Sequence, residues 1–224
     1  MYGLLSALYS KKNQVLDLHH YNPIRISGFL LNSWKTKTIK DAELLDQAYI
    51  PERHQILGND LASAHFIVYR GGRVKFIGDN FWISKDNKAK TCDKLPNNYV
   101  KDYYLEAIDA SGLRLRYEGL ANLTNLSQLT ELRLRGCPCV DDWFVDRISG
   151  EFCSTLEHLD LSDCHQVTEN ALSCIYRITN LKTLVLENIV KSRSFEYACL
   201  LLEDALPQLN IIGVKYMDVT KLSD

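Results

Sequence analysis

Apolar and polar residues alternate in short runs that recur along the second half of the chain. The pattern leucine-x-x-leucine-x-leucine-x-x-cysteine is complete at residues 129–137 and again at residues 156–164. Three weaker copies replace the cysteine or some of the leucines with other residues, most of them apolar. The copies begin at Leu105, Leu129, Leu156, Leu181 and Leu209, at intervals of 24, 27, 25 and 28 residues. Five copies at near-constant spacing indicate an internal repeat.

Each copy predicts a strand followed by a helix. Its alternating leucines are typical of a short strand with one buried face. The apolar spacing then becomes helical at 140–148, 167–178 and 192–207, with Thr168 as an N-cap and Pro207 as a stop. One such unit cannot bury its apolar side alone, whereas stacked units can. The sequence therefore predicts an α/β fold, a leucine-rich-repeat solenoid of the cysteine-containing type, with about five repeats in a domain at 101–224.

The repeated cysteine is expected to fill space. Cys137 and Cys164 should turn the chain out of each strand, point inward and stack about 5 Å apart. A zinc site built from these residues with Cys139 and His165 is disfavoured, because their spacing matches no established zinc signature. Redox chemistry is disfavoured too, because no basic cluster flanks these thiols. We therefore expect no metal and no cofactor.

Residues between the leucines should face solvent on the concave side of the sheet, where solenoids commonly bind partners. The central row is predicted to run from Asp109 through Arg133 and Asp160 to Val185 and Gly213, with Ile211 and Lys215 ending the two flanking rows. Asp109, Arg133 and Asp160 should form a lateral ion-pair ladder, which either decorates the surface or contributes to binding. The candidate partner-binding residues are Asp109, Glu131, Arg133, Arg135, His158, Asp160, Ser162 and Glu187.

Residues 41–100 carry no repeat and should form a capping module for the open end of the solenoid. A helical pattern is interrupted at Pro51 and stops near Gly58. Two alternating runs at 64–78, joined by Gly71-Gly72, predict a β-hairpin. Trp82, with its aromatic neighbour, should cover the hairpin or the first repeat. The expected cap is thus an N-terminal helix plus a β-hairpin.

Composition narrows the function classes. The net charge of −2 gives no bulk attraction to nucleic acid, and no apolar run reaches the ~18–20 residues of a membrane span. Residues 1–40 carry six basic residues and one acidic residue. This favours an organelle transit peptide, which would be a mitochondrial one under the resemblance described below, over a disordered basic tail or a tail that packs on the domain. No metalloprotease, nucleophile-elbow or phosphate-loop motif occurs, so we expect no enzyme.

Three segments carry a family resemblance: "DLASAHFIVYRGGRVKFIGDNFW" at 60–82, "EAIDASGLRLRYEGLANL" at 106–123 and "LRGCPCVDDWFVDRIS" at 134–149. Together they resemble the mitochondrial leucine-rich-repeat family called distal membrane-arm assembly component 2, or ATP synthase subunit s-like, whose shorter relative is coupling factor B. The resemblance covers roughly residues 59–216. The repeats alone are less specific, because F-box substrate receptors use the same cysteine-bearing repeat.

The resemblance implies a non-catalytic mitochondrial protein, in the matrix or on the matrix face of the inner membrane, peripheral rather than spanning. Its partners would be membrane-arm subunits or assembly factors of respiratory complex I (NADH dehydrogenase), and no nucleic acid is expected. One alternative is a regulatory or coupling component of ATP synthase. Another is a substrate receptor of an SCF-type ubiquitin ligase, which would need an F-box before the repeats.

Overall fold

The computed structural model describes residues 41–85, 95–189 and 192–216. The chain divides into two compact units, residues 1–43 and 44–224. The basic segment 1–40, expected to be a transit peptide, lies outside the described residues.

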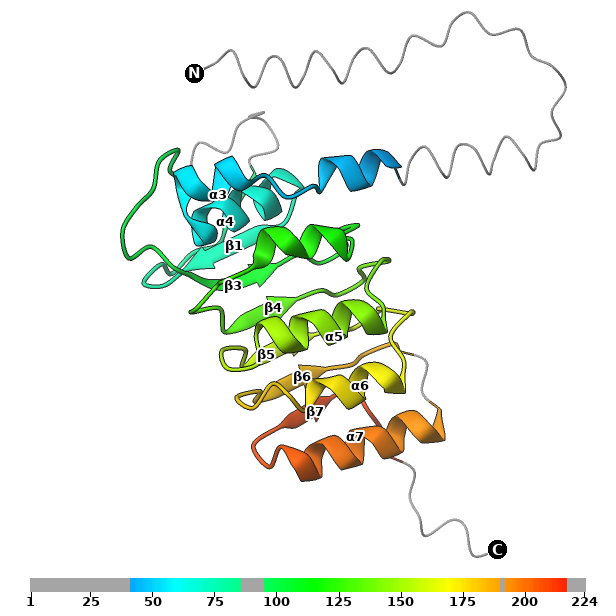
Figure 1. Ribbon diagram of the computed structural model, residues 1–224. Helices are drawn as coiled ribbons and strands as arrows, with labels where there is room; N and C mark the ends of the chain where they lie inside the picture. The colour runs from blue at the N-terminus through cyan, green and yellow to red at the C-terminus, as the bar shows by residue number, and fades with distance from the viewer. Residues whose placement is uncertain (1–40, 86–94, 190–191, 217–224) are drawn as a thin grey trace, which may run out of the picture. The chain divides into compact units, whose positions relative to one another are not determined.

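A seven-stranded, mostly parallel sheet with helices along it forms the second, mixed α/β unit (Figure 1). The strand order is β2-β1-β3-β4-β5-β6-β7, so the sheet is open. Strands β3 to β7 are mutually parallel and follow chain order, while β1 is antiparallel to both of its neighbours. The strands are β1 (Arg73–Phe76), β2 (Ile83–Ser84), β3 (Leu105–Asp109), β4 (Glu131–Arg133), β5 (His158–Asp160), β6 (Thr183–Val185) and β7 (Asn210–Ile212).

The repeated leucines fix the register of the parallel strands. Leu132, Leu159 and Leu184 lie side by side on β4, β5 and β6, and each is at most 1% exposed. Ile108 of β3 takes the same place in the degenerate first copy. The predicted pairing of these four copies is confirmed. Burying one such side chain per strand stabilises the fold by roughly 1.5–3 kcal/mol each.

The units of β3 to β6 each leave their strand through a left-handed residue that the alternation pattern did not indicate. Gly112, Gly136, Asp163 and Asn188 stand four residues after the paired apolar positions, and all have positive φ. Glycine, asparagine and aspartate are the residues that adopt this conformation at least cost. The backbone N–H of Gly136 then donates to the carbonyl of Ser162 in the next unit (2.8 Å). The hydrogen-bonded ladder therefore continues beyond the strands.

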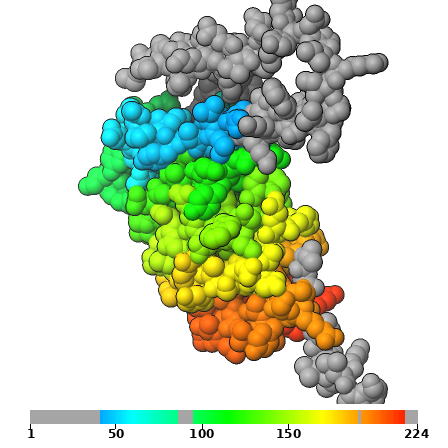
Figure 2. Space-filling model, turned by 45° about the vertical axis from the view of Figure 1, so that its right-hand side comes forward, coloured from blue at the N-terminus to red at the C-terminus, as the bar shows by residue number. Residues whose placement is uncertain are grey.

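Helices α5 (Asp142–Glu151), α6 (Glu169–Ile175) and α7 (Arg193–Ala205) lie in order along one face of the sheet (Figure 1). Their N-caps are Asp141, Thr168 and Ser192, each of which accepts a hydrogen bond from a backbone N–H of the first turn. The 3-10 helix η1 (Glu118–Leu123) stands in the first copy where the later copies have an α-helix. On the molecular surface, successive segments form successive bands from cyan to orange (Figure 2).

The repeated cysteines point into the core, as expected. Cys137 and Cys164 are at most 1% exposed, and their thiols donate to the carbonyls of Ala110 and Leu134, respectively, at 3.1 Å. Those two carbonyls occupy equivalent positions in the preceding units. Burial raises the pKa of Cys137 to about 12 and that of Cys164 to about 11. Both side chains are thus neutral thiols that join one unit to the next.

The predicted hairpin at 64–78 is wrong. Its first half belongs to helix α4 (Asn59–Tyr69), which follows α3 (Pro51–Leu57) after Gly58. The pattern misleads because α4 is buried on nearly all sides, so its β-branched and aromatic residues read equally well as a strand. Gly72 lets the chain turn from α4 into β1, since a Cβ there would lie 2.6 Å from Ile67 Cγ2. Strand β1 instead pairs antiparallel with β2 and with β3.

The last copy is shifted by one residue from its prediction. Ile211, rather than Ile212, pairs with Leu184 and is 8% exposed, whereas Ile212 is 40% exposed. Ile212 therefore ends the central row in place of Gly213, and the flanking rows shift with it. The two adjacent isoleucines make either register possible from the pattern alone.

Candidate protein-binding face

The polar face is the side of the sheet opposite the buried leucines. Adjacent strands place Glu131 beside His158, and Arg133 beside both Asp109 and Asp160. Of these five residues, Asp109 is buried and the other four are partly exposed. The predicted candidates on β4 and β5 therefore lie together as neighbours on two parallel strands. Arg135 and Glu187 continue the same surface beyond the strand ends, where they form an ion pair of 3.1 Å.

The predicted ion-pair ladder is wrong, although its residues are neighbours. Arg133 pairs with Glu131 of its own strand, and Asp109 pairs with Arg73 of β1 (2.7 Å). Strand β1 covers the first repeat and supplies a cation that the repeat pattern could not reveal. The polar face therefore begins with Arg73 and not with β3.

Trp82 connects the non-repeating segment to the polar face. The guanidinium carbons of Arg73 and Arg133 each lie over its indole ring, 5.3 Å from the ring centroid. Such contacts contribute roughly 0.5–1 kcal/mol at exposed sites and hold the planar groups in register. Trp82 was expected to cover the hairpin or the first repeat; its ring instead contacts one arginine on β1 and one on β4 of the second repeat. Nothing in the repeat pattern indicated that Arg73 would contact Trp82.

Asp109 is the most buried of the charged candidates, at 5% exposure. Its carboxylate accepts hydrogen bonds from the backbone N–H of Ser111 (3.0 Å) and from Arg73 Nε (2.8 Å). Burial alone would raise the pKa of Asp109, but the hydrogen bonds from Ser111 and Arg73 outweigh it and lower the pKa below its ordinary value. Asp109 therefore acts as a fixed charge that orients Arg73.

A second cluster forms where the strands end. Arg135 Nε lies 3.0 Å from Asp163 Oδ2, and Asn188 Nδ2 donates to the other oxygen of Asp163 (2.9 Å). The hydrogen bond from Asn188, together with Arg135, lowers the pKa of Asp163. Ser162 is fully buried, and its hydroxyl accepts a hydrogen bond from the backbone N–H of Glu187 (3.2 Å). Ser162 thus supports the cluster from below.

The chemistry of this face is that of charge and aromatic contact. Within the described ranges, no three histidine, cysteine or acidic side chains converge as metal ligands would. In the same part of the chain, no helix combines the length and apolarity needed to cross a membrane. What the face presents is alternating charge beside an indole ring, which suits contact with a polar protein surface.

Comparison with known proteins gives the family. No family model matches the chain. Distal membrane arm assembly component 2 of Drosophila melanogaster is 41% identical over 210 residues, which cover 92% of this chain and 72% of that protein. This chain belongs to the distal membrane arm assembly component 2 family.

The family has more distant relatives. Proteins named mitochondrial ATP synthase subunit s are 27% identical in Rattus norvegicus and 24% identical in Homo sapiens, in each case over 162 residues. These matches cover 71% of this chain and 78% of the relatives. The segments that carried the resemblance in the sequence of this member include α4, β1 and Trp82. They are the parts that place Arg73 and Trp82 on the polar face.

Proposed function

We propose that this chain is a non-catalytic mitochondrial factor that binds proteins during assembly of the distal membrane arm of respiratory complex I. The observation that carries the proposal is the 41% identity, over 92% of the chain, to a protein named for distal membrane arm assembly. Mitochondrial location is supported by the names of the ATP synthase relatives and by the basic composition of residues 1–40. The matrix, or the matrix face of the inner membrane, is the proposed compartment.

The strand–helix units at 101–224 are proposed to be a leucine-rich-repeat solenoid, with residues 41–100 as its cap. Parallel strands in constant register and a thiol at the same place in two units support this reading. The polar face is then the concave side, and we assign partner binding to it. The proposed contact residues are Glu131, Arg133, Arg135, His158, Asp160 and Glu187, together with Trp82, while the buried candidates Asp109 and Ser162 hold their neighbours in place.

Cells that lack the protein provide the test. Native gels should show loss of mature complex I and accumulation of intermediates without the distal membrane arm, and the unaltered chain should restore assembly. Arg133→Ala should restore it less well at equal protein level. Arg193→Ala, which removes the same kind of side chain from an exposed place on α7, is the matched control. Normal complex I in cells without the protein would refute the assembly role.

A second candidate is a regulatory or coupling role in ATP synthase, which the 27% identity to the rat subunit s favours. Affinity purification from cross-linked mitochondria separates the two. Complex I membrane-arm subunits should be enriched under the first proposal, and ATP synthase subunits under the second. A mixed result is resolved with Arg133→Ala, because only contacts made by the polar face should be lost.

A further inference from the structure

The helix-covered side carries an aromatic hollow that the polar face does not involve. Trp143 on α5 is 74% exposed, an unusual position for the largest side chain, and Tyr117 at the start of η1 is 46% exposed. These two rings line a hollow of about 350 Å³ together with Glu118 and Asp141. The hollow thus combines two aromatic side chains with two carboxylates at the junction of the first two units.

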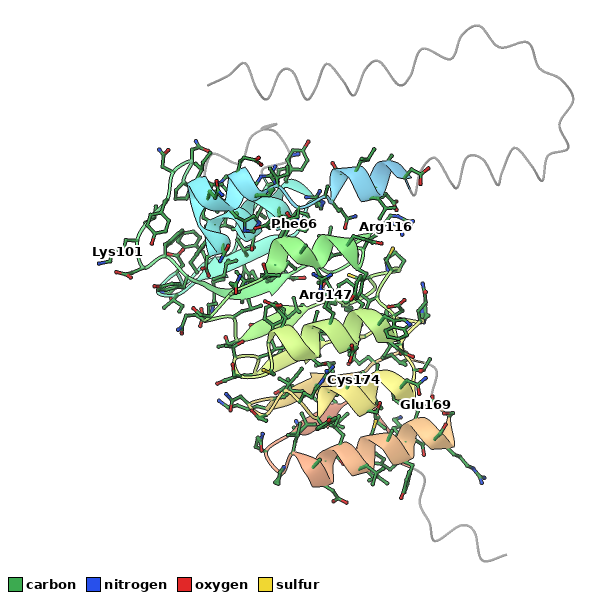
Figure 3. The ribbon with its side chains drawn as sticks, viewed as in Figure 1. Phe66, Lys101, Arg116, Arg147, Glu169 and Cys174 are labelled. Carbon is green, nitrogen blue, oxygen red and sulfur yellow. The ribbon has the colours of Figure 1, made fainter. Side chains whose placement is uncertain are left out.

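Neighbouring residues hold the hollow in shape. Arg147, one helical turn after Trp143, donates from Nη1 to the carbonyl of Tyr117 (3.0 Å), and its guanidinium lies 4.9 Å from the Tyr117 ring centroid. Figure 3 shows Arg147 on the helix side of the sheet. Asp141 is fixed as the N-cap of α5, where Oδ1 accepts from Phe144 N (2.9 Å). Three of the groups around the hollow are therefore preorganised.

The chemistry of the lining selects the occupant. An apolar side chain would remove water from Glu118 and Asp141 without replacing their hydrogen bonds, which is unfavourable. An anion would be repelled by both carboxylates. A cation is attracted by the two carboxylates and by the indole ring of Trp143, whereas the Tyr117 ring already carries Arg147. Arg147 does not fill the hollow's need for a cation, because its Nη1 donates to the Tyr117 carbonyl and its guanidinium lies over the Tyr117 ring.

We propose that this hollow receives a lysine or arginine side chain of a protein partner, as a second contact surface on the side opposite the polar face. A free small cation would remain largely in water between rings this exposed. A cation attached to a protein gains further contacts around the hollow, and exposed tryptophan, tyrosine and arginine are the residues that dominate such interfaces. Trp143 is the anchor of the site, with Glu118 and Asp141 as its charge pair.

The test uses the full chain labelled with 5-fluorotryptophan, whose three tryptophan resonances are assigned with Trp143→Phe and Trp82→Phe. The probes are three short acetylated peptide amides that differ only in a central lysine, norleucine or glutamate. The lysine peptide should shift the Trp143 resonance in a saturable way that high salt weakens. The norleucine peptide, which keeps the aliphatic stem, should shift it much less, and the glutamate peptide should leave it unchanged.

Charge-removing variants complete the design. Glu118→Gln and Asp141→Asn should each lower the affinity for the lysine peptide by a factor of about five or less, as expected for an exposed ion pair. The double variant should lower this affinity further. Asparagine is a good N-cap, so Asp141→Asn keeps α5 intact. Equal shifts from lysine and norleucine would overturn the proposal in favour of a merely apolar patch. No shift of Trp143, or a shift unaffected by both substitutions, would overturn it as well.

Discussion

The guanidinium of Arg133 on β4 lies over the ring of Trp82, which immediately precedes β2 at the far edge of the sheet. The indole therefore reaches across β1 and β3, the two strands between them in the sheet order, to a side chain of the repeats. Arg73 shares the same ring and binds Asp109. The non-repeating segment and the repeats thus build one surface jointly.

This relationship gives a prediction about Arg133. Arg133→Ala should lower the free energy of unfolding by at most about 1 kcal/mol, because its ion pair and ring contact are partly exposed. The amount of partner protein that is purified from mitochondria together with the variant should nevertheless fall. Urea unfolding followed by circular dichroism measures the first effect and quantitative affinity purification the second. Unfolding of the variant would show that Arg133 is structural and not a contact residue.

Leu159, unlike Arg133, is fully buried, and it lies between Leu132 and Leu184 on the neighbouring strands. Leu159→Ala should lower the free energy of unfolding by about 2–5 kcal/mol through the cavity that it leaves. His158→Ala changes the adjacent residue on the other face of β5 and should cost much less. Urea midpoints of the two variants make the comparison, and the reverse order would show that the strand register is wrong.

The strands could be predicted from the sequence wherever several residues of one copy specify the same register. Strands β3 to β6 were predictable, because each copy places several apolar residues at fixed spacing and a single register satisfies them all. β7 was not, because Ile211 and Ile212 are both apolar and either can face the core.

The non-repeating part was less predictable for a different reason. Helix α4 packs against β1, β3 and η1, so most of its surface is apolar and its helical period disappears. The candidate site was predictable only where candidates lie on predicted strands. Arg73 lies in the misread segment and Trp82 lies just after it, so the contact of Trp82 with Arg133 had no signal in the repeat pattern.

Gly72 offers a sharp test of the turn between α4 and β1. A Cβ there would lie 2.6 Å from Ile67 Cγ2 and 2.8 Å from the Asp109 carbonyl oxygen, so Gly72→Ala should destabilise the protein by about 1–3 kcal/mol. Gly150→Ala is the matched control. Gly150 lies within α5 with open space around its Cα, and alanine there should stabilise by ~0.5–1 kcal/mol. Thermal unfolding of both variants should therefore shift in opposite directions.

The buried thiols should be inert in the folded protein. Cys137 and Cys164 are buried with raised pKa values of about 12 and about 11, so almost no thiolate exists at neutral pH. Iodoacetamide near neutral pH should therefore modify Cys139 and Cys153, which are partly exposed, well before these two. Peptide mass spectrometry over time measures the order, and urea should abolish the difference. Rapid native modification of Cys164 would contradict its placement.

The lowered pKa of Asp109 leads to a prediction about the free energy of unfolding at acidic pH. Its pKa is lowered in the folded state from an ordinary value of 3.8, so the folded protein binds its proton less readily than the unfolded chain does. The stabilising contribution is therefore fully present above pH 3.8 and is lost as the pH falls through the lower folded pKa. Asp109→Asn removes the charge that Arg73 binds. The difference in unfolding free energy between the unaltered chain and this variant should shrink on acidification, as measured by urea titrations at a series of pH values. A difference that stays constant or grows towards low pH would mean that burial, and not Ser111 and Arg73, controls this carboxyl group.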